Sequence, residues 1–189
     1  MFEQINLLLS FVFALAMTHL LSTAAELVLA RNRVIFSGPH AIWMFNAVLM
    51  LLTNWLTMGI GGGEIKHWTP SLILVLFTAT ITLYLVCATL AIRVRHDEPV
   101  DMHEFFESNR LVIFGTLAAG SLSGMVLNYA TRAISAHPND WIRVDVMILP
   151  TLAVIAVAAC AKPQWLQMSA ACVYTVVTLG FFANFAVTN

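Results

Sequence analysis

The first apolar segment of the chain, residues 7–33, constrains the fold more than any other stretch of the sequence. It reads LLLSFVFALAMTHLLSTAAELVLARNR and is long enough to cross a bilayer, for which about 20 apolar residues suffice. Two ionisable side chains, His19 and Glu26, fall inside it, and the segment ends in a basic RNR tripeptide. Because ionisable groups are costly in hydrocarbon, these two positions are candidate functional sites.

The composition of the whole chain is that of a membrane protein. Of the 189 residues, 60% are hydrophobic and 10% are charged, and the mean hydropathy is +0.84. A soluble domain carries about 25% charged residues, so this chain has too few to cover a water-facing surface. The net charge is −1 and no block of like charges forms a basic tail, so nothing in the sequence points to nucleic acid as a partner.

Apolar runs separated by turn residues predict six transmembrane helices in a single domain that covers residues 1–189. Most runs begin at a capping, proline or glycine signal, of which Thr69-Pro70 is an example. The predicted helices cover residues 5–30, 39–60, 70–93, 103–132, 141–161 and 163–186. The sequence therefore predicts an all-α integral membrane protein built as a bundle of six transmembrane helices.

Lysines and arginines near the helix ends predict the orientation of this bundle. One side collects six of them: Arg31, Arg33, Arg93, Arg95, Arg110 and Lys162. The opposite side collects three: Lys66, Arg132 and Arg143. Since cytoplasmic loops are enriched in lysine and arginine, the first side is assigned to the cytoplasm, and both chain termini are then expected on the outer side.

Five polar side chains of the first three predicted helices fall in the inner half of the membrane. His19 and Glu26 share one face of the first helix, which is expected to point into the bundle. The second helix runs antiparallel to the first, so His40 comes near the level of Glu26, and Asn46 near that of His19. With Tyr84 of the third helix they are predicted to form an intramembrane cluster that contacts a transported species or a ligand.

Further polar residues are candidates for the same or a second cluster, and one alternative explains all of them without a ligand. Asn109 and Arg110 are candidate members of the same cluster, and an outer-half set comprises Asn54, Asn128, Asp145 and Asn184. The alternative is that such side chains only join helices by hydrogen bonds, worth about 0.6 kcal/mol each on average. Separately, the segment from Gly120 to Gly124 presents a small face for close packing against another helix, in this chain or in a second copy.

The ionisable residues also limit the cofactors that the chain could hold. His19 and His40 differ in depth by about half a leaflet, which disfavours a haem held by two histidines and leaves a single-histidine ligand open. Retinal needs a lysine inside a span, and both lysines, Lys66 and Lys162, lie at helix ends, so retinal is excluded. Any cofactor therefore stays unknown.

No motif in the sequence predicts catalysis or a metal site. The HExxH, GxSxG, GxGxxG and P-loop patterns are absent. Residues 96–107 contain histidines and acids, but their spacing matches no specific metal site. Acidic residues at a helix start, stabilised by the helix dipole, explain this segment more simply.

Two short motifs resemble those of a known group of proteins. With THLL at residues 18–21 and HAIW at residues 40–43, the chain resembles an uncharacterised family of small six-span bacterial inner-membrane proteins. That family has T/A-H-L-L in its first helix, H-x-x-W at the start of its second, and an aromatic-acidic segment before its fourth, here residues 104–110. The resemblance spans most of the chain and implies the fold and a bacterial inner membrane, with both termini periplasmic, but no activity.

Three hypotheses for function follow from these observations. The first is a small oligomeric channel or transporter-like protein whose polar path passes His19 and Glu26, with the charge state of His19 as a gate. The second is a membrane-embedded redox or cofactor-binding protein with His19 as a ligand. The third is a non-catalytic accessory or scaffold subunit that packs through Gly120 and Gly124. The expected partners are the bilayer and either further copies of the chain or another membrane protein.

Overall fold

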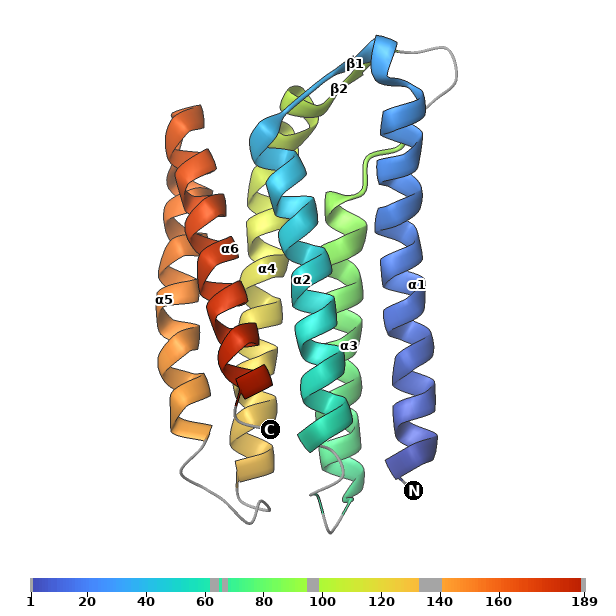
Figure 1. Cartoon of the computed structure of the whole chain (residues 1–189), viewed down its shortest axis with the longest axis vertical. Coiled ribbons are helices and arrows are strands. Elements are labelled where there is room, and N and C mark those ends of the chain that lie inside the picture. Colours follow the sequence, from blue (N-terminus) through green and yellow to red (C-terminus); the bar gives the residue numbers. More distant parts are fainter. Residues whose placement is uncertain (1, 62–64, 66–67, 95–98, 133–140, 188–189) are drawn as a thin grey trace.

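The computed structural model is all-helical, as the sequence predicts (Figure 1). The structure describes residues 2–61, 65, 68–94, 99–132 and 141–187. Its α-helices are α1 (Phe2–Leu29), α2 (Gly38–Gly61), α3 (Pro70–Leu90), α4 (Met102–Arg132), α5 (Trp141–Cys160) and α6 (Gln164–Val187). Between α1 and α2 lie a 3-10 turn, Arg31–Arg33, and the strand β1 (Val34–Ile35), and the strand β2 (Val100–Asp101) precedes α4.

The helix ends lie within three residues of the predicted ones, because the local signals act as expected. Thr69 caps α3: its Oγ1 accepts a hydrogen bond from the Leu72 amide at 3.3 Å, and Pro70 is the first helical residue. At its other end α3 stops at Leu90, since Ala91 adopts extended backbone. Asp101 caps α4, with its Oδ1 accepting from the amides of His103 at 2.8 Å and Glu104 at 3.0 Å.

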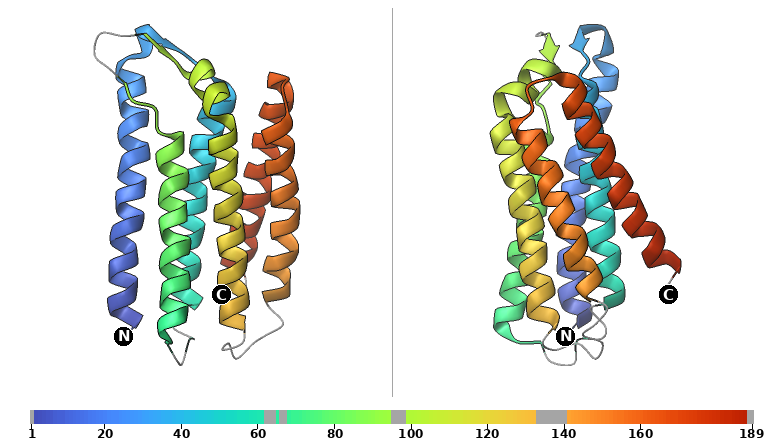
Figure 2. Two further views of the ribbon diagram at one scale, coloured as in Figure 1. Left: turned by 180° about the vertical axis from the view of Figure 1, so that it is seen from behind. Right: turned by 90° about the vertical axis from the view of Figure 1, so that its left-hand side faces the viewer.

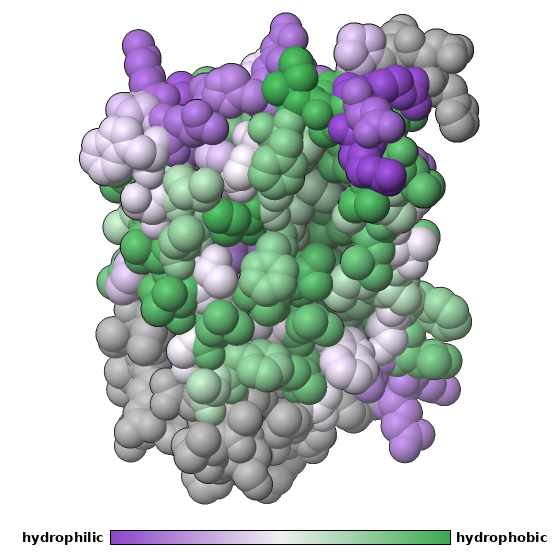
Figure 3. All heavy atoms as spheres, turned by 45° about the horizontal axis from the view of Figure 1, so that its top comes forward, coloured by the Kyte–Doolittle hydropathy of each residue, from purple (hydrophilic) through white to green (hydrophobic). Residues whose placement is uncertain are grey.

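Five of the six helices contain a described segment that is long and apolar enough to cross a membrane. These segments are Glu3–Leu29, Gly38–Gly59, Pro70–Leu90, Met102–Thr131 and Gln164–Ala183. In α5 the described apolar segment, Ile148–Cys160, is shorter. Large apolar side chains also face outward, with Leu111 75% exposed and Val176 69% exposed. Figure 3 shows hydrophilic side chains along the top of the view and a smaller group at the lower right, with apolar side chains over the face between them.

The helices form a bundle with α1 at one edge and the α5–α6 pair at the other (Figures 1 and 2). Helix α1 packs against α3 and α2, α3 packs against α4, and the α5–α6 pair packs against α4 and α2. The short parallel pair of β1 and β2 lies at the end opposite the chain termini, with Val34 beside Val100 and Ile35 beside Asp101. This pairing ties the segment after α1 to the start of α4.

An aromatic cluster holds α2, α4 and α6 together in the half of the bundle near β1 and β2. The Trp43 ring lies edge-on to Phe114 at 5.1 Å between centroids and beside Tyr174 at 5.2 Å. Phe114 in turn lies edge-on to Phe106 at 5.9 Å. All four side chains are buried, and such edge-to-face pairs add to the stabilisation from burial alone.

The predicted small face of α4 is closely packed at one glycine and open at the other. A Cβ atom at Gly120 would lie 3.2 Å from the Met50 methyl of α2 and 3.5 Å from Val86 Cγ2 of α3. A Cβ atom at Gly124 would meet nothing within 4 Å. Of these two glycines Gly120 is therefore the closely packed one, and its neighbours belong to other helices of the same chain.

This difference predicts opposite outcomes for the same substitution at the two glycines. Gly120→Leu should lower the unfolding temperature, because the new side chain displaces Met50 and meets Val86; overpacking of this kind costs about 1–3 kcal/mol. Gly124→Leu is the matched control, with the same gain in helix propensity and open space beside it. Thermal unfolding of both variants in one detergent checks this, and equal unfolding temperatures would contradict it.

Candidate functional site

The structure separates the five residues of the predicted polar cluster. His40 and Asn46 are fully buried between helices. His19 and Glu26 lie exposed on the outer face of α1, and the partly buried Tyr84 stacks beside His19 with ring centroids 6.5 Å apart. The prediction that the His19 and Glu26 face of the first helix points into the bundle is therefore wrong.

Helix α1 turns a different face inward because that face is the more apolar one. Its buried side chains recur every three or four residues: Ile5, Leu9, Phe13, Ala16, Leu20, Thr23 and Leu27. A helix at the edge of a bundle buries only one such stripe, so the polar residues between these positions are left outside. Large apolar side chains such as Phe11 and Leu15 also lie on the outward side of α1, so the spacing of the buried stripe does not by itself give the rotation of the helix.

His40 joins three helices at the end of the bundle near β1 and β2. Its Nε2 lies 2.8 Å from the carbonyl oxygen of Leu90, at the end of α3, and must donate because a carbonyl only accepts. The ring also packs against Phe105 and Phe106 at the start of α4, with centroids 5.4 Å and 5.7 Å away. His40 thus holds the start of α2 against α3 and α4. This geometry fits the alternative in which such polar side chains only join helices.

Asn46 joins α2 to α6 in the same way. Its Nδ2 donates to the carbonyl oxygen of Ala171 at 3.0 Å, and its Oδ1 accepts from Thr175 Oγ1 at 2.7 Å. Both ends of the amide are therefore satisfied inside the protein. The geometry of Asn46 fits a hydrogen bond between helices.

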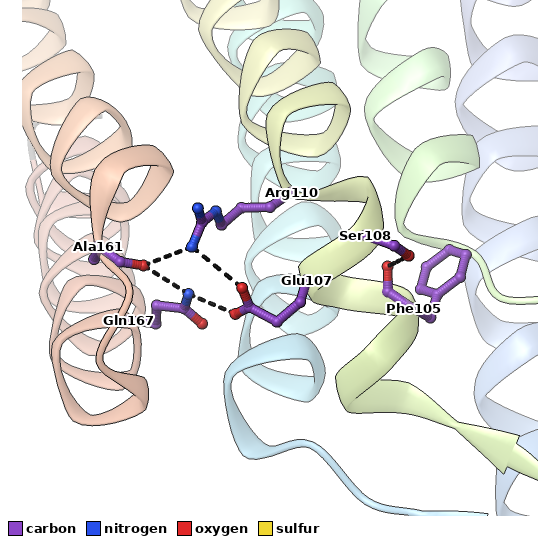
Figure 4. A network of polar contacts seen from close by, with 6 residues as sticks. All are labelled: Phe105, Glu107, Ser108, Arg110, Ala161 and Gln167. Atoms are coloured by element: carbon purple, nitrogen blue, oxygen red, sulfur yellow. Dashed lines mark hydrogen bonds and ion pairs between the residues drawn. The ribbon is translucent and has the colours of Figure 1, made fainter.

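A second polar network, centred on Gln167, fastens the α5–α6 turn to α4 (Figure 4). The buried Gln167 Nε2 donates to Glu107 Oε1 at 2.7 Å and to the Ala161 carbonyl oxygen at 2.9 Å. Arg110 Nη1 donates to the same carbonyl at 2.9 Å and to Glu107 Oε2 at 3.2 Å. The candidate Arg110 thus joins α4 to the α5–α6 turn, and its hydrogen bonds to described residues do not include the histidines of α1 and α2. No pattern in the sequence distinguishes Gln167 from the exposed Gln164 one turn before it.

Several buried polar atoms in this half of the bundle have no hydrogen-bond partner among the described residues. They are Ser37 Oγ, His40 Nδ1, Trp43 Nε1, Arg110 Nε and Gln167 Oε1. Three of them lie on one face of the first turns of α2. Buried polar groups in native proteins normally bind protein atoms or ordered water, so these atoms mark sites for internal water.

The half of the bundle nearer the chain termini contains a cavity of about 220 Å³. Its wall comes from the second halves of α2, α4 and α6, from the first half of α3, and from α1 and α5. Among the described residues that line it none is charged, and most are apolar. Asn54 and Asn128 of the predicted outer-half set belong to this wall, whereas the side chains of Asp145 and Asn184 lie outside the described part.

Hydroxyl groups of the wall present acceptors to the cavity. Thr57 Oγ1 donates to the Thr53 carbonyl at 2.8 Å, and Ser121 Oγ donates to the Leu117 carbonyl at 3.1 Å. Threonines elsewhere in the wall bond back along their own helices in the same way. Because each hydroxyl hydrogen is used, the oxygen lone pairs remain for a bound molecule. The side chain of Asn128, which has no partner among the described residues, adds both a donor and an acceptor.

The aromatic cluster closes this cavity at its inner end. Tyr174 lines the cavity and also contacts Trp43, and its hydroxyl lies 3.7 Å from the sulfur of Met50, another residue of the wall. Beyond Trp43 come the fully buried rings of Phe106 and Phe114. The wall therefore ends at packed aromatic side chains about halfway along the bundle.

Comparison with known proteins adds no family to these observations. No protein-family model, no curated protein and no solved structure matches the chain. Among the described residues no group of three histidine, cysteine, aspartate or glutamate side chains lies close enough to hold a metal ion.

The Gln167 network predicts a difference between two glutamines of α6. Gln167→Leu removes two hydrogen bonds and leaves Glu107 with Arg110 alone, so it should destabilise the fold by about 1–2 kcal/mol. Gln164→Leu, on the exposed side of the same turn, should change stability by less than about 0.5 kcal/mol. Thermal unfolding in matched detergent measures both. A Gln167 variant as stable as the Gln164 variant would show that the network contributes nothing.

Proposed function

We propose that the chain is an integral protein of the bacterial inner membrane, crossed by six helices, with the β1–β2 end in the cytoplasm. Five apolar helices of sufficient length and an apolar outer surface support membrane insertion. Arg31, Arg33, Arg93, Arg110 and Lys162 all belong to the β1–β2 end, which supports the orientation. Both termini and the cavity then face the periplasm.

Within that membrane we propose a transporter-like function, in which the cavity takes up an uncharged small molecule from the periplasmic side. The observation that carries this proposal is the cavity itself: a wall whose described residues are uncharged and include several hydroxyl and amide groups, closed at its inner end by the Trp43 cluster. Ligand sites in proteins are typically such concave, mostly apolar spaces with a few polar groups. A wall without charge offers no compensation for an ion that sheds its water.

The wall also indicates the chemistry of the molecule. Its free oxygen lone pairs favour a hydrogen-bond donor, and its apolar area favours a hydrocarbon body beside that donor. An alcohol or amide with an aromatic or aliphatic body satisfies both conditions. A charged or fully polar solute satisfies only one of them.

The way in which the α5–α6 pair is attached supports a transporter rather than an open channel. Its polar contacts with α2 and α4, through Asn46 and Gln167, lie in the cytoplasmic half of the bundle. Towards its carboxyl end α6 leans away from the other helices (Figure 2). A helix held at one end and divergent at the other suits a motion of α6 that opens the cavity to one side at a time.

One-sided access to the cavity gives the first prediction of this proposal. Thr57→Cys, in a chain with Cys160 and Cys172 replaced by serine, should react with a charged, membrane-impermeant methanethiosulfonate from the periplasmic side only. Ala47→Cys, at a buried position of the same helix that is not part of the cavity wall, is the control and should stay unlabelled from both sides. Reaction of Thr57→Cys from the cytoplasmic side, or from neither side, would contradict the assigned access.

Ligand chemistry gives the second prediction. Protein in lipid nanodiscs should retain more benzyl alcohol than the Gly124→Leu variant, whose new side chain occupies the cavity. Asn128→Leu should weaken binding roughly three- to tenfold, the effect of one lost hydrogen bond of about 0.5–1.5 kcal/mol. The wild type should also prefer benzyl alcohol to benzyl methyl ether, which has no hydroxyl hydrogen.

Equilibrium dialysis with radiolabelled ligand measures this binding, and the Gly124→Leu nanodiscs correct for partition into lipid. Equal retention by wild type and variant would rule out binding in the cavity. If the cavity alternates between the two sides, benzyl alcohol should also raise the labelling of Ala47→Cys from the cytoplasmic side. Unchanged labelling of Ala47→Cys would show a binding protein that does not transport.

A further inference from the structure

The outer face of α1 carries polar side chains in the middle of a membrane-spanning helix. His19 is exposed and lies ten residues before Leu29, which places it roughly 15 Å from the cytoplasmic end of the helix. Thr18, Ser22 and Glu26 are exposed on the same side of the helix. Neither the His19 ring nor the Glu26 carboxylate has a hydrogen-bond or ion-pair partner among the described residues.

An exposed histidine at this depth indicates that another protein surface covers it. Hydrocarbon offers no hydrogen bonds, and polar residues in membrane helices almost always face protein or a water-filled space. Among the described residues the ring contact of His19 is with Tyr84, at 6.5 Å between centroids, and this is a stacking contact without a hydrogen bond. The missing hydrogen-bond partner must therefore come from outside the chain.

We infer that the outer face of α1, formed by Leu15, Thr18, His19, Ser22 and Glu26, is the interface with a second copy of the same chain. Two copies with the same membrane orientation are related by a two-fold axis along the membrane normal, which brings the two His19 rings to the same depth. A neutral imidazole has one donor and one acceptor, so two facing histidines can bond to each other. The face is thus self-complementary in its hydrogen bonding.

The charged and the small side chains at this face also fit a second copy of the chain. Glu26 lies five residues before the exposed Arg31, and neither has an ion-pair partner among the described residues. Across a two-fold axis the carboxylate of one copy comes within reach of the guanidinium of the other. Thr18 and Ser22 are small and lie one helical turn apart, which allows two helices to approach closely at the level of His19.

This inference assumes the proposed insertion in the membrane but not the proposed transport. Among the described residues the cavity meets α1 at Phe13, which belongs to the buried stripe and not to this outer face, so the cavity does not depend on a second copy. A monomer in the membrane would leave the cavity proposal standing. Loss of ligand binding at the cavity would likewise leave the dimer standing.

Disulfide cross-linking in native membrane vesicles tests the interface. Ser22→Cys, with Cys160 and Cys172 replaced by serine, should form a covalent dimer when oxidised with copper phenanthroline. In the matched control Ser22 is unchanged and Cys160 alone is replaced by serine, so that the exposed cysteine is the native Cys172 of α6, at the opposite edge of the bundle. This control should remain monomeric. A dimer through Cys172 but not through Ser22→Cys, no dimer in either case, or a cross-link to a different protein would each overturn the inference.

Native mass spectrometry of the same proteins in nanodiscs tests the role of His19. His19→Leu should weaken the dimer about tenfold, in the upper range for one hydrogen bond between membrane helices. His19→Gln keeps a donor and an acceptor and should dimerise like the wild type. Dimers of equal stability in all three would show that His19 does not make the contact, and a monomeric wild type would reject the interface altogether. Resistance of the protein to carbonate extraction confirms separately that it is membrane-inserted.

Discussion

A polar group away from water must find its partner inside the protein, and the rest of this structure depends on that constraint. The helices satisfy the backbone groups. The buried side chains that join helices then bond to the carbonyl groups of a neighbouring helix or turn: His40 to Leu90, Asn46 to Ala171, and Gln167 to Ala161. These contacts lie in the half of the bundle near β1 and β2, together with the aromatic cluster around Trp43. That half is therefore the fixed part of the bundle.

The other half of the bundle is held by apolar contacts and contains the cavity. The serines and threonines of the cavity wall that bond back to their own helices do not join one helix to another, and their oxygens can still accept a hydrogen bond. A bundle that is locked at one end and loosely filled at the other can admit a molecule without losing its fold. This asymmetry is the structural basis of the proposed transporter-like function.

The constraint also identifies the residues that a lone chain does not explain. Among the described residues, the exposed His19 ring has a stacking contact with Tyr84 and no hydrogen bond, and the side-chain amide of Asn128 beside the cavity has no partner. One of them faces outward and the other faces the cavity, so they require different partners. A second copy of the chain meets the needs of His19, and a small hydrogen-bonding molecule meets those of Asn128.

The sequence by itself determined that the chain is helical and where each helix begins and ends. Apolar runs of sufficient length, the Thr69-Pro70 start and the Asp101 cap are local signals, and each acts on residues within one or two turns. It also grouped Asn54 with Asn128, and both line the same cavity. The rotation of each helix about its axis was decided by the tertiary structure. Helices of a membrane protein are apolar on most sides, so composition says little about which side faces the neighbours.

The first helix shows this division most clearly. Its sequence identified His19 and Glu26 as unusual, but packing of the stripe through Leu9, Phe13 and Leu20 against α2 and α3 turned them outward. The pairing of Gln167 with Glu107 and Arg110, and the open space beside Gly124, likewise depend on contacts between residues far apart in the chain. Such contacts are fixed only when all six helices are packed, because each one needs two surfaces to meet.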